Sequence, residues 1–247
     1  MEVHAHSHSE RKKWHHYLWE FLMLFLAVFC GFLAENFREH QVDRQRENEY
    51  MQSLVKDLQR DTAFLNTGFP RKDERLRAID SVFLYFEAHP DAKEIPGYVA
   101  VQMRRTAWDR IYERNTGTIN QLKNAGGLRL IRNREVSDSI AAYDLSWSRA
   151  DFWKDGYIYQ QRSCNSLIEK ILDPYAFLNL YRTVPGNGVQ QQREISVLKI
   201  NTGPMGEYLN FLWHQKGWTR QDLDFYRSIY LSATRLIVLI RKEYHVE

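Results

Sequence analysis

Histidines near the N-terminus are the residues whose type and spacing point most directly to chemistry. The sequence HAHSHS places imidazole rings at alternate positions, as His4, His6 and His8. Neutral imidazole nitrogens bind Zn²⁺, Cu²⁺ or Ni²⁺, and a flexible tail can bring several of them to one ion. No Cys or carboxylate at fixed metal-site spacing accompanies them, so a tail without metal geometry is the alternative. We therefore expect no cofactor, and a weakly held divalent transition metal at this tail, residues 1–16, is the alternative.

A basic group surrounds a pair of glycines near the middle of the chain. The passage LKNAGGLRLIRNR carries its cations at Lys123, Arg129, Arg132 and Arg134. Such a group can bind an anion, a lipid headgroup or an acidic partner. The alternative is an ordinary solvated surface.

Sequence signatures of enzymes are missing. The chain has no Walker loop, no G-x-S-x-G, no H-E-x-x-H, no C-x-x-C and no dinucleotide fingerprint. Cys164 lies at core spacing on a predicted helix and has no adjacent histidine, which favours a buried structural thiol over a nucleophile. We therefore predict a protein that is not an enzyme and has no catalytic residue. A hydrolase with a non-standard site is the alternative.

Composition limits the partners and the architecture. The 247 residues are 44% hydrophobic, enough for one domain with a sizeable core plus an appended segment. Because 34 Lys and Arg face 31 Asp and Glu, the net charge is only +3. That value is far from the basic footprint of a nucleic-acid binder, so no nucleic-acid partner is expected.

One apolar segment, residues 17–34, predicts a transmembrane helix, which we call the membrane segment. As a helix it is about 27 Å long, close to the ~30 Å hydrocarbon thickness of a bilayer. Trp14, Tyr17 and Trp19 are placed as an interfacial belt. A cleaved signal is a poor match, because Phe32-Leu33-Ala34 lacks the small residues of a cleavage site. A buried helix of a soluble protein is the other alternative.

The positive-inside rule hardly distinguishes the two possible orientations of the membrane segment. Three cations precede the membrane segment, and three follow it at Arg38, Arg44 and Arg46. The short basic tail directly before the apolar run is typical of a signal-anchor. We therefore expect a cytoplasmic N-terminus and a C-terminal domain on the other side of the membrane.

One face of the membrane segment predicts self-association. Ala27 and Gly31 form a small-xxx-small pair, which lets two membrane helices approach closely. The whole stripe consists of Glu20, Leu24, Ala27, Gly31 and Ala34. The alternative is that the small residues only reflect the usual composition of membrane helices.

Beyond the membrane segment we predict a polar helical stalk, residues 35–50, and an all-α bundle of four to six helices, residues 51–247. Gly68 and Pro70 are expected to break the first helix, and the next two helices carry an apolar face each. Those faces are formed by Leu76, Ile79, Phe83 and Phe86, and by Val101, Trp108, Ile111 and Tyr112.

The second half of the bundle is predicted from its helix-end signals. Thr118 and Gln121 have capping-box spacing, the glycine pair suits a helix C-terminus, and Asn133 is a good N-cap for a helix that ends before Pro174. EISVLKI is either a short strand or a connector, and two helices follow it, through Tyr208 and through Leu223 to Tyr244. Five tryptophans are expected in the core: Trp108, Trp147, Trp153, Trp213 and Trp218.

The block KKWHHYLWEFLMLFLAVFCGFLAENFREH and the later passage TINQLKNAGGLRLIRN resemble a family of uncharacterised single-pass membrane proteins of Bacteroidota. The resemblance covers roughly residues 12–62 and the glycine passage, and residues 150–247 add little to it. It implies a membrane-anchored helical protein of a bacterial inner membrane. It implies no activity and no catalytic residue.

Together these patterns predict a non-enzymatic, membrane-anchored helical module. Its partners are the lipid bilayer and either another protein or further copies of itself. A sensor or metal-handling protein that uses the N-terminal His tail is the alternative.

Overall fold

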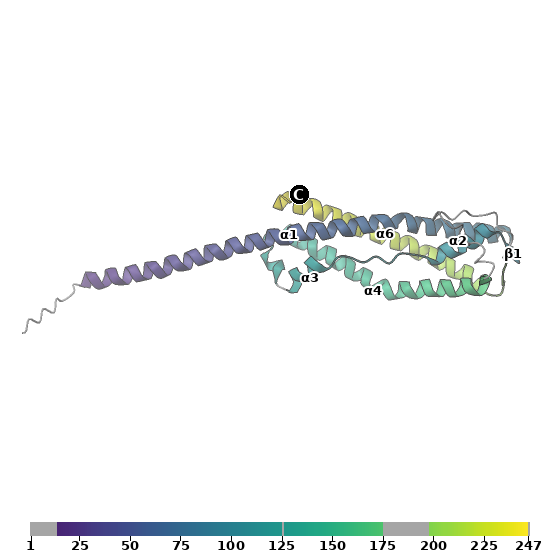
Figure 1. Cartoon of the computed structure of the whole chain (residues 1–247), viewed down its shortest axis with the longest axis horizontal. Helices are drawn as coiled ribbons and strands as arrows, with labels where there is room; N and C mark the ends of the chain where they lie inside the picture. The colour runs from purple at the N-terminus through teal and green to yellow at the C-terminus, as the bar shows by residue number, and fades with distance from the viewer. Residues whose placement is uncertain (1–13, 125, 175–197, 247) are drawn as a thin grey trace, which may run out of the picture. The chain divides into compact units, whose positions relative to one another are not determined.

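The computed structural model describes residues 14–124, 126–174 and 198–246, and the predicted all-α fold is confirmed. Within these ranges the chain forms five α-helices, α1 Trp14–Ala88, α2 Gly97–Ala107, α3 Gly117–Asn124, α4 Arg134–Ile171 and α6 Met205–Tyr244. Within the same ranges a 3₁₀ turn, η1 Gly127–Leu130, precedes α4. The five α-helices are labelled in Figure 1. The chain divides into two compact units, Met1–Tyr50 and Met51–Glu247.

The first unit is the N-terminal part of α1. Every residue from 14 to 41 is exposed, including the whole apolar run. Among the described residues, α1 holds the one stretch that is long and apolar enough to cross a membrane, and none of that stretch is buried in the protein. Because a core helix of a soluble protein buries its apolar side chains, this exposure is consistent with a membrane anchor.

The second unit is a helical bundle built on the C-terminal part of α1. A buried seam runs along that helix with alternating spacings of three and four residues, the spacing of a coiled-coil core face. The seam consists of Met51, Leu54, Leu58, Asp61, Leu65, Gly68, Lys72, Arg75, Ile79, Val82 and Phe86. Three positions of this core face are therefore occupied by charged residue types, Asp61, Lys72 and Arg75.

Two predicted breaks in the helices are wrong. α1 continues through Gly68 and Pro70, because the seam packs against the bundle on both sides of the proline and outweighs one lost backbone hydrogen bond. The two helices expected near the C-terminus are one, α6, which runs for 40 residues with Tyr208, Leu223 and Ile240 all buried along it.

The predicted helix through Trp108, Ile111 and Tyr112 is also wrong in its second half. α2 ends at Ala107, and residues 108–116 form an extended segment without regular structure. Side chains of other elements bind its polar groups. The carboxylate of Asp61 on α1 accepts from Asn115 N at 2.8 Å, from Asn115 Nδ2 at 2.7 Å and from Tyr143 Oη at 2.7 Å.

The helix ends near the glycine pair were predicted in part. Gly126 has a φ of 67°, the left-handed conformation expected after a helix, and Asn133 caps α4 by accepting from Val136 N at 3.2 Å. The capping box at Thr118 is wrong, because Thr118 lies inside α3 and its hydroxyl donates to Asp57 on α1 at 2.7 Å.

At the far end of the bundle, two short strands close the core. β1 Glu94–Ile95 pairs antiparallel with β2 Leu198–Lys199, with Glu94 opposite Lys199 and Ile95 opposite Leu198. This confirms a strand rather than a connector for that part of EISVLKI. Beneath the strands lies a core of α1, α2, α4 and α6 side chains that includes Ile79, Met103 and the buried Cys164.

Candidate functional site

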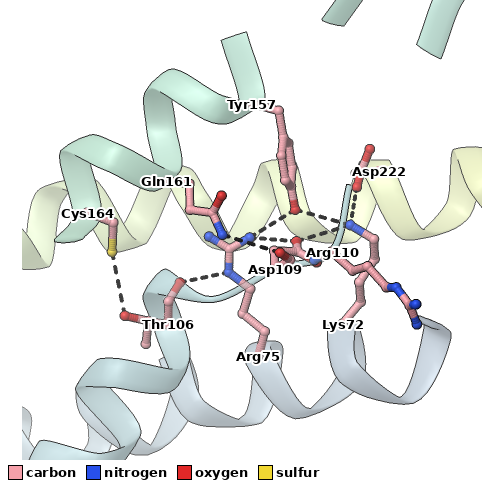
Figure 2. Close-up of polar contacts among 9 residues, drawn as sticks. All are labelled: Lys72, Arg75, Thr106, Asp109, Arg110, Tyr157, Gln161, Cys164 and Asp222. Carbon is pink, nitrogen blue, oxygen red and sulfur yellow. Dashed lines mark hydrogen bonds and ion pairs between the residues drawn. The ribbon is translucent and has the colours of Figure 1, made fainter. Parts of the chain in front are cut away.

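Two cations on the seam of α1 form the centre of the candidate site. Lys72 and Arg75 are each only 1% exposed. Nζ of Lys72 donates to Oδ2 of Asp109 at 3.0 Å and also to the carboxylate of Asp222. Nη1 of Arg75 donates to the same Asp109 oxygen at 2.7 Å, and Nε donates to the Thr106 carbonyl at 2.8 Å (Figure 2). We call Lys72, Arg75, Asp109 and Asp222 the charged cluster.

The charges of the charged cluster cancel. Asp109 comes from the extended segment and Asp222 from α6, so two carboxylates from separate elements face two cations of α1. Burial alone would lower the pKa of Lys72, but Asp109 and Asp222 outweigh it and raise that pKa above its ordinary value. Lys72 is therefore a charged ammonium at neutral pH and not an amine nucleophile.

Three tyrosines surround the Lys72 ammonium. Nζ lies 5.3 Å from the ring centre of Tyr112, 5.0 Å from that of Tyr157 and 5.7 Å from that of Tyr226. These distances are those of cation–π contacts, which strengthen when the cation is withdrawn from water. Tyr157 Oη also accepts from Lys72 at 3.1 Å and from Arg75 Nη1 at 3.0 Å, as Figure 2 shows.

A pocket of about 320 Å³ opens beside the charged cluster, at the lower end of the usual size of ligand sites. Tyr112, Tyr157, Asp222 and Tyr226 belong both to its lining and to the surroundings of Lys72. Among the described residues, the lining comprises Arg110, Ile111, Tyr112, Arg149, Ala150, Asp151, Trp153, Lys154, Tyr157, Trp218, Gln221, Asp222, Phe225 and Tyr226. α4, α6 and the extended segment therefore form the walls of one pocket.

Exposed aromatic rings continue from the pocket onto the surface. Trp153 of α4 is 59% exposed and Trp218 of α6 is 47% exposed, and their rings meet edge to face at 6.3 Å. Phe152 is 77% exposed and contacts Trp153 with ring centres 5.2 Å apart. We call Phe152, Trp153 and Trp218 the aromatic rim.

The tryptophan prediction is correct only for Trp147, which is fully buried. Trp108 and Trp213 are even more exposed than the tryptophans of the aromatic rim, at 68% and 69%. Apolar spacing along a helix cannot distinguish a side chain that faces the core from one that faces a pocket or a partner. This is why the spacing pointed to the wrong environment for four of the five.

The residues predicted for self-association all lie on α1. Glu20, Leu24, Ala27, Gly31 and Ala34 are all exposed, and Nε2 of His16 lies 3.1 Å from the Glu20 carboxylate. The exposure leaves the stripe open to lipid or to a second helix, and self-association stays a prediction.

The predicted basic group consists of four exposed side chains around the glycine pair. Lys123 forms an ion pair with Asp144 at 3.0 Å, and Arg134 forms one with Asp138 at 3.6 Å. Arg129 and Arg132 lie on η1 and directly after it. Lys123 and Arg134 are thus paired with carboxylates, and the binding of an anion or acidic partner by this group stays a prediction.

His4, His6 and His8 lie outside the described residues, so metal binding by the tail stays an untested alternative. Within the ranges that the structure describes, no group of three His, Cys, Asp or Glu side chains has the arrangement of a metal site. Cys164 is buried as expected, and burial raises the pKa of its thiol. Comparison with protein-family models, curated proteins and solved structures found no match for the chain.

Sequence reasoning missed the charged cluster, although a signal for it exists. Lys72 and Arg75 continue the three-and-four spacing of Leu58, Leu65 and Ile79, so periodicity alone places them in the core. A helix break predicted at Gly68 and Pro70 interrupts this period, whereas α1 continues through both residues.

Proposed function

We propose that this protein is a membrane-anchored helical module that binds a protein partner and has no catalytic role. The membrane segment holds the protein in a bilayer, and the bundle presents the pocket and the aromatic rim. The aromatic rim supports this proposal most directly. Exposed Trp and other aromatic side chains beside a pocket are typical of the energetically dominant part of protein interfaces.

The charged cluster supports a role other than catalysis. Its two cations and two carboxylates are paired with each other, and six of the fourteen described residues that line the pocket are aromatic. An acid–base or nucleophilic mechanism requires a group with a proton affinity tuned to its task and access to the substrate. Lys72, the most central of these groups, has a raised pKa and is enclosed by three tyrosines.

We place the protein in a bacterial inner membrane, with the N-terminus in the cytoplasm and the bundle in the periplasm. The short basic N-terminal tail and the family resemblance support this placement. To test it, the Glu207→Cys variant is labelled with a membrane-impermeant maleimide in spheroplasts. Labelling without lysis supports a periplasmic bundle, whereas labelling only after lysis contradicts it. Release of the chain by carbonate washing would contradict the anchor.

Partner binding is tested with a photo-crosslinking amino acid at Phe152 in native membranes. We expect a discrete adduct with another protein, lost in the Trp153→Ala and Trp218→Ala variants and kept in Trp213→Ala. Trp213 is a matched control, because it is an exposed tryptophan of α6 that does not line the pocket. An adduct with twice the mass of the chain indicates self-association. An adduct pattern unaffected by all three substitutions contradicts binding at the aromatic rim.

A further inference from the structure

Among the described residues, the pocket lining has an excess of positive charge. Three cations line it, Arg110, Arg149 and Lys154, against the carboxylates of Asp151 and Asp222. Lys72 already neutralises Asp222, and Glu113 lies 2.8 Å from Lys154. Two arginines therefore remain opposite Asp151.

The two arginines are available to a ligand in different ways. Arg149 is exposed and forms no hydrogen bond or ion pair within the described parts of the chain. Arg110 lies over the Phe64 ring at 4.3 Å and donates to the Thr67 hydroxyl at 3.2 Å, contacts that orient its guanidinium without neutralising it. Positive side chains at the edge of an apolar pocket attract anions and exclude cations.

The aromatic rim distinguishes a macromolecular ligand from a small one. A compound that filled only the pocket would leave Phe152 in water, because this ring does not line the pocket and is 77% exposed. A peptide segment can place one side chain in the pocket while its neighbours cover the rim. Trp and Arg together are the residue types most enriched at the centre of such contacts.

We propose that the pocket receives an aromatic side chain from an acidic segment of the partner protein, with Arg110 and Arg149 contacting the flanking carboxylates. The floor for that side chain is formed by Tyr157 and Tyr226, which the charged cluster holds in place. This inference rests on the proposed function and adds the chemistry of the partner's contact segment to it.

The test uses the full chain in phosphatidylcholine nanodiscs and two photoreactive peptides. One carries benzoylphenylalanine flanked on both sides by Asp and Glu, and the other carries Lys in place of each acidic residue. The lipid is zwitterionic, so the lysine peptide is not drawn to the membrane. We expect the acidic peptide to form adducts on α4 and α6 at pocket-lining residues, with a yield about tenfold above that of the lysine peptide at low salt.

Substitutions make the charge argument specific. Arg149→Glu is expected to lower the acidic peptide's yield about tenfold, whereas Arg162→Glu leaves it unchanged. Arg162 is an exposed arginine of the same helix that does not line the pocket. Trp153→Ala is expected to lower the yield of both peptides, and Trp213→Ala that of neither.

Three results would overturn the inference: equal yields for the two peptides, adducts outside the pocket lining, or equal labelling by free benzophenone-4-carboxylate at the same concentration. The last would assign the pocket to a small aromatic anion. If these results appear while the Phe152 adduct in native membranes still depends on Trp153, the proposed function stands and only the acidic segment is wrong.

Discussion

Nζ of Lys72 lies 3.0 Å from Oδ2 of Asp109, and each of these two side chains is only 1% exposed. A buried ion pair of this kind is weak evidence for stability in itself, because withdrawing both charges from water offsets much of their attraction. Removing one partner of the pair is strongly destabilising, because it leaves the other charge buried without a counter-charge.

Asp109→Asn therefore leaves two buried cations with one carboxylate. We expect a loss of about 3–5 kcal/mol in the free energy of unfolding. The control is Asp80→Asn, which breaks the partly exposed pair with Lys216 and should cost about 0–1 kcal/mol. Thermal unfolding of the full chain in detergent, followed by circular dichroism, measures both. Equal effects of the two substitutions would show that the buried pair carries no special penalty.

Gly68→Ala tests why a glycine lies on the seam. A methyl group there would overlap the Tyr112 ring, with Cβ only 2.6 Å from Cζ. Although alanine favours a helix by about 1 kcal/mol, the clash should dominate, and we expect a net destabilisation of about 1–3 kcal/mol. Gly217→Ala on α6 meets nothing within 4 Å and should stabilise by about 0.5–1 kcal/mol. Opposite signs for the two variants in the same unfolding assay support this packing, and stabilisation by both would contradict it.

Tyr143→Phe removes one of the donors that hold the buried Asp61 carboxylate. The Tyr143 hydroxyl lies 2.7 Å from Asp61 Oδ2, and a hydrogen bond to a charged group contributes about 1.5–3 kcal/mol. We expect a loss of that size. Tyr159→Phe is the matched control, because Tyr159 is a tyrosine of the same helix that is 72% exposed. A loss for Tyr159→Phe as large as that for Tyr143→Phe would refute the role of the buried bond.

The bundle should lose stability at alkaline pH. Burial raises the pKa of Tyr112 to about 12 and raises the pKa of Tyr226, and the pKa of Lys72 is raised by its carboxylates despite burial. All three groups are thus held protonated in the folded protein, while the unfolded chain releases their protons from about pH 10 upward. Their contribution to stability is complete below that pH and is lost as the pH rises toward about 12.

Melting temperatures of the full chain at successive pH values between about 8 and 11 measure this alkaline loss. The Tyr112→Phe variant should show a shallower decline than the wild type, because it lacks one of the titrating groups. A melting temperature that stays constant across this range would contradict the burial of these groups.

Much of the bundle follows from periodicity and helix-end signals. The N-cap at Asn133 and the apolar spacing from Val136 to Ile171 locate α4 well, because a long helix repeats its pattern many times. The break predicted at Gly68 and Pro70 is wrong, because the low helix propensity of these two residues costs less free energy than the packing of the seam around them contributes. Helix propensity is a property of single residues, whereas packing of the seam stabilises α1 along the whole length of the bundle.

The site was harder to predict because its residues are far apart in the sequence. Asp109 lies 37 residues from Lys72, and Asp222 lies 150 residues from it. No local pattern pairs a lysine with an acid at such a distance. The extended segment could not be predicted for a similar reason, since the partner of its Asn115 backbone N–H is the carboxylate of Asp61 on another helix.

The distance in sequence between Lys72 and Asp222 also constrains how the protein is made. During synthesis α1 emerges first, with Lys72 and Arg75 already on its inward face, and the carboxylate of α6 follows only after 150 further residues. Until then Asp109 is the one carboxylate of the charged cluster that has been made, and it must serve two cations that need counter-charges before they can leave water. The bundle should therefore complete its folding only after nearly all of the chain has left the ribosome, and premature termination within α6 would yield a product for proteolysis rather than a shorter working protein.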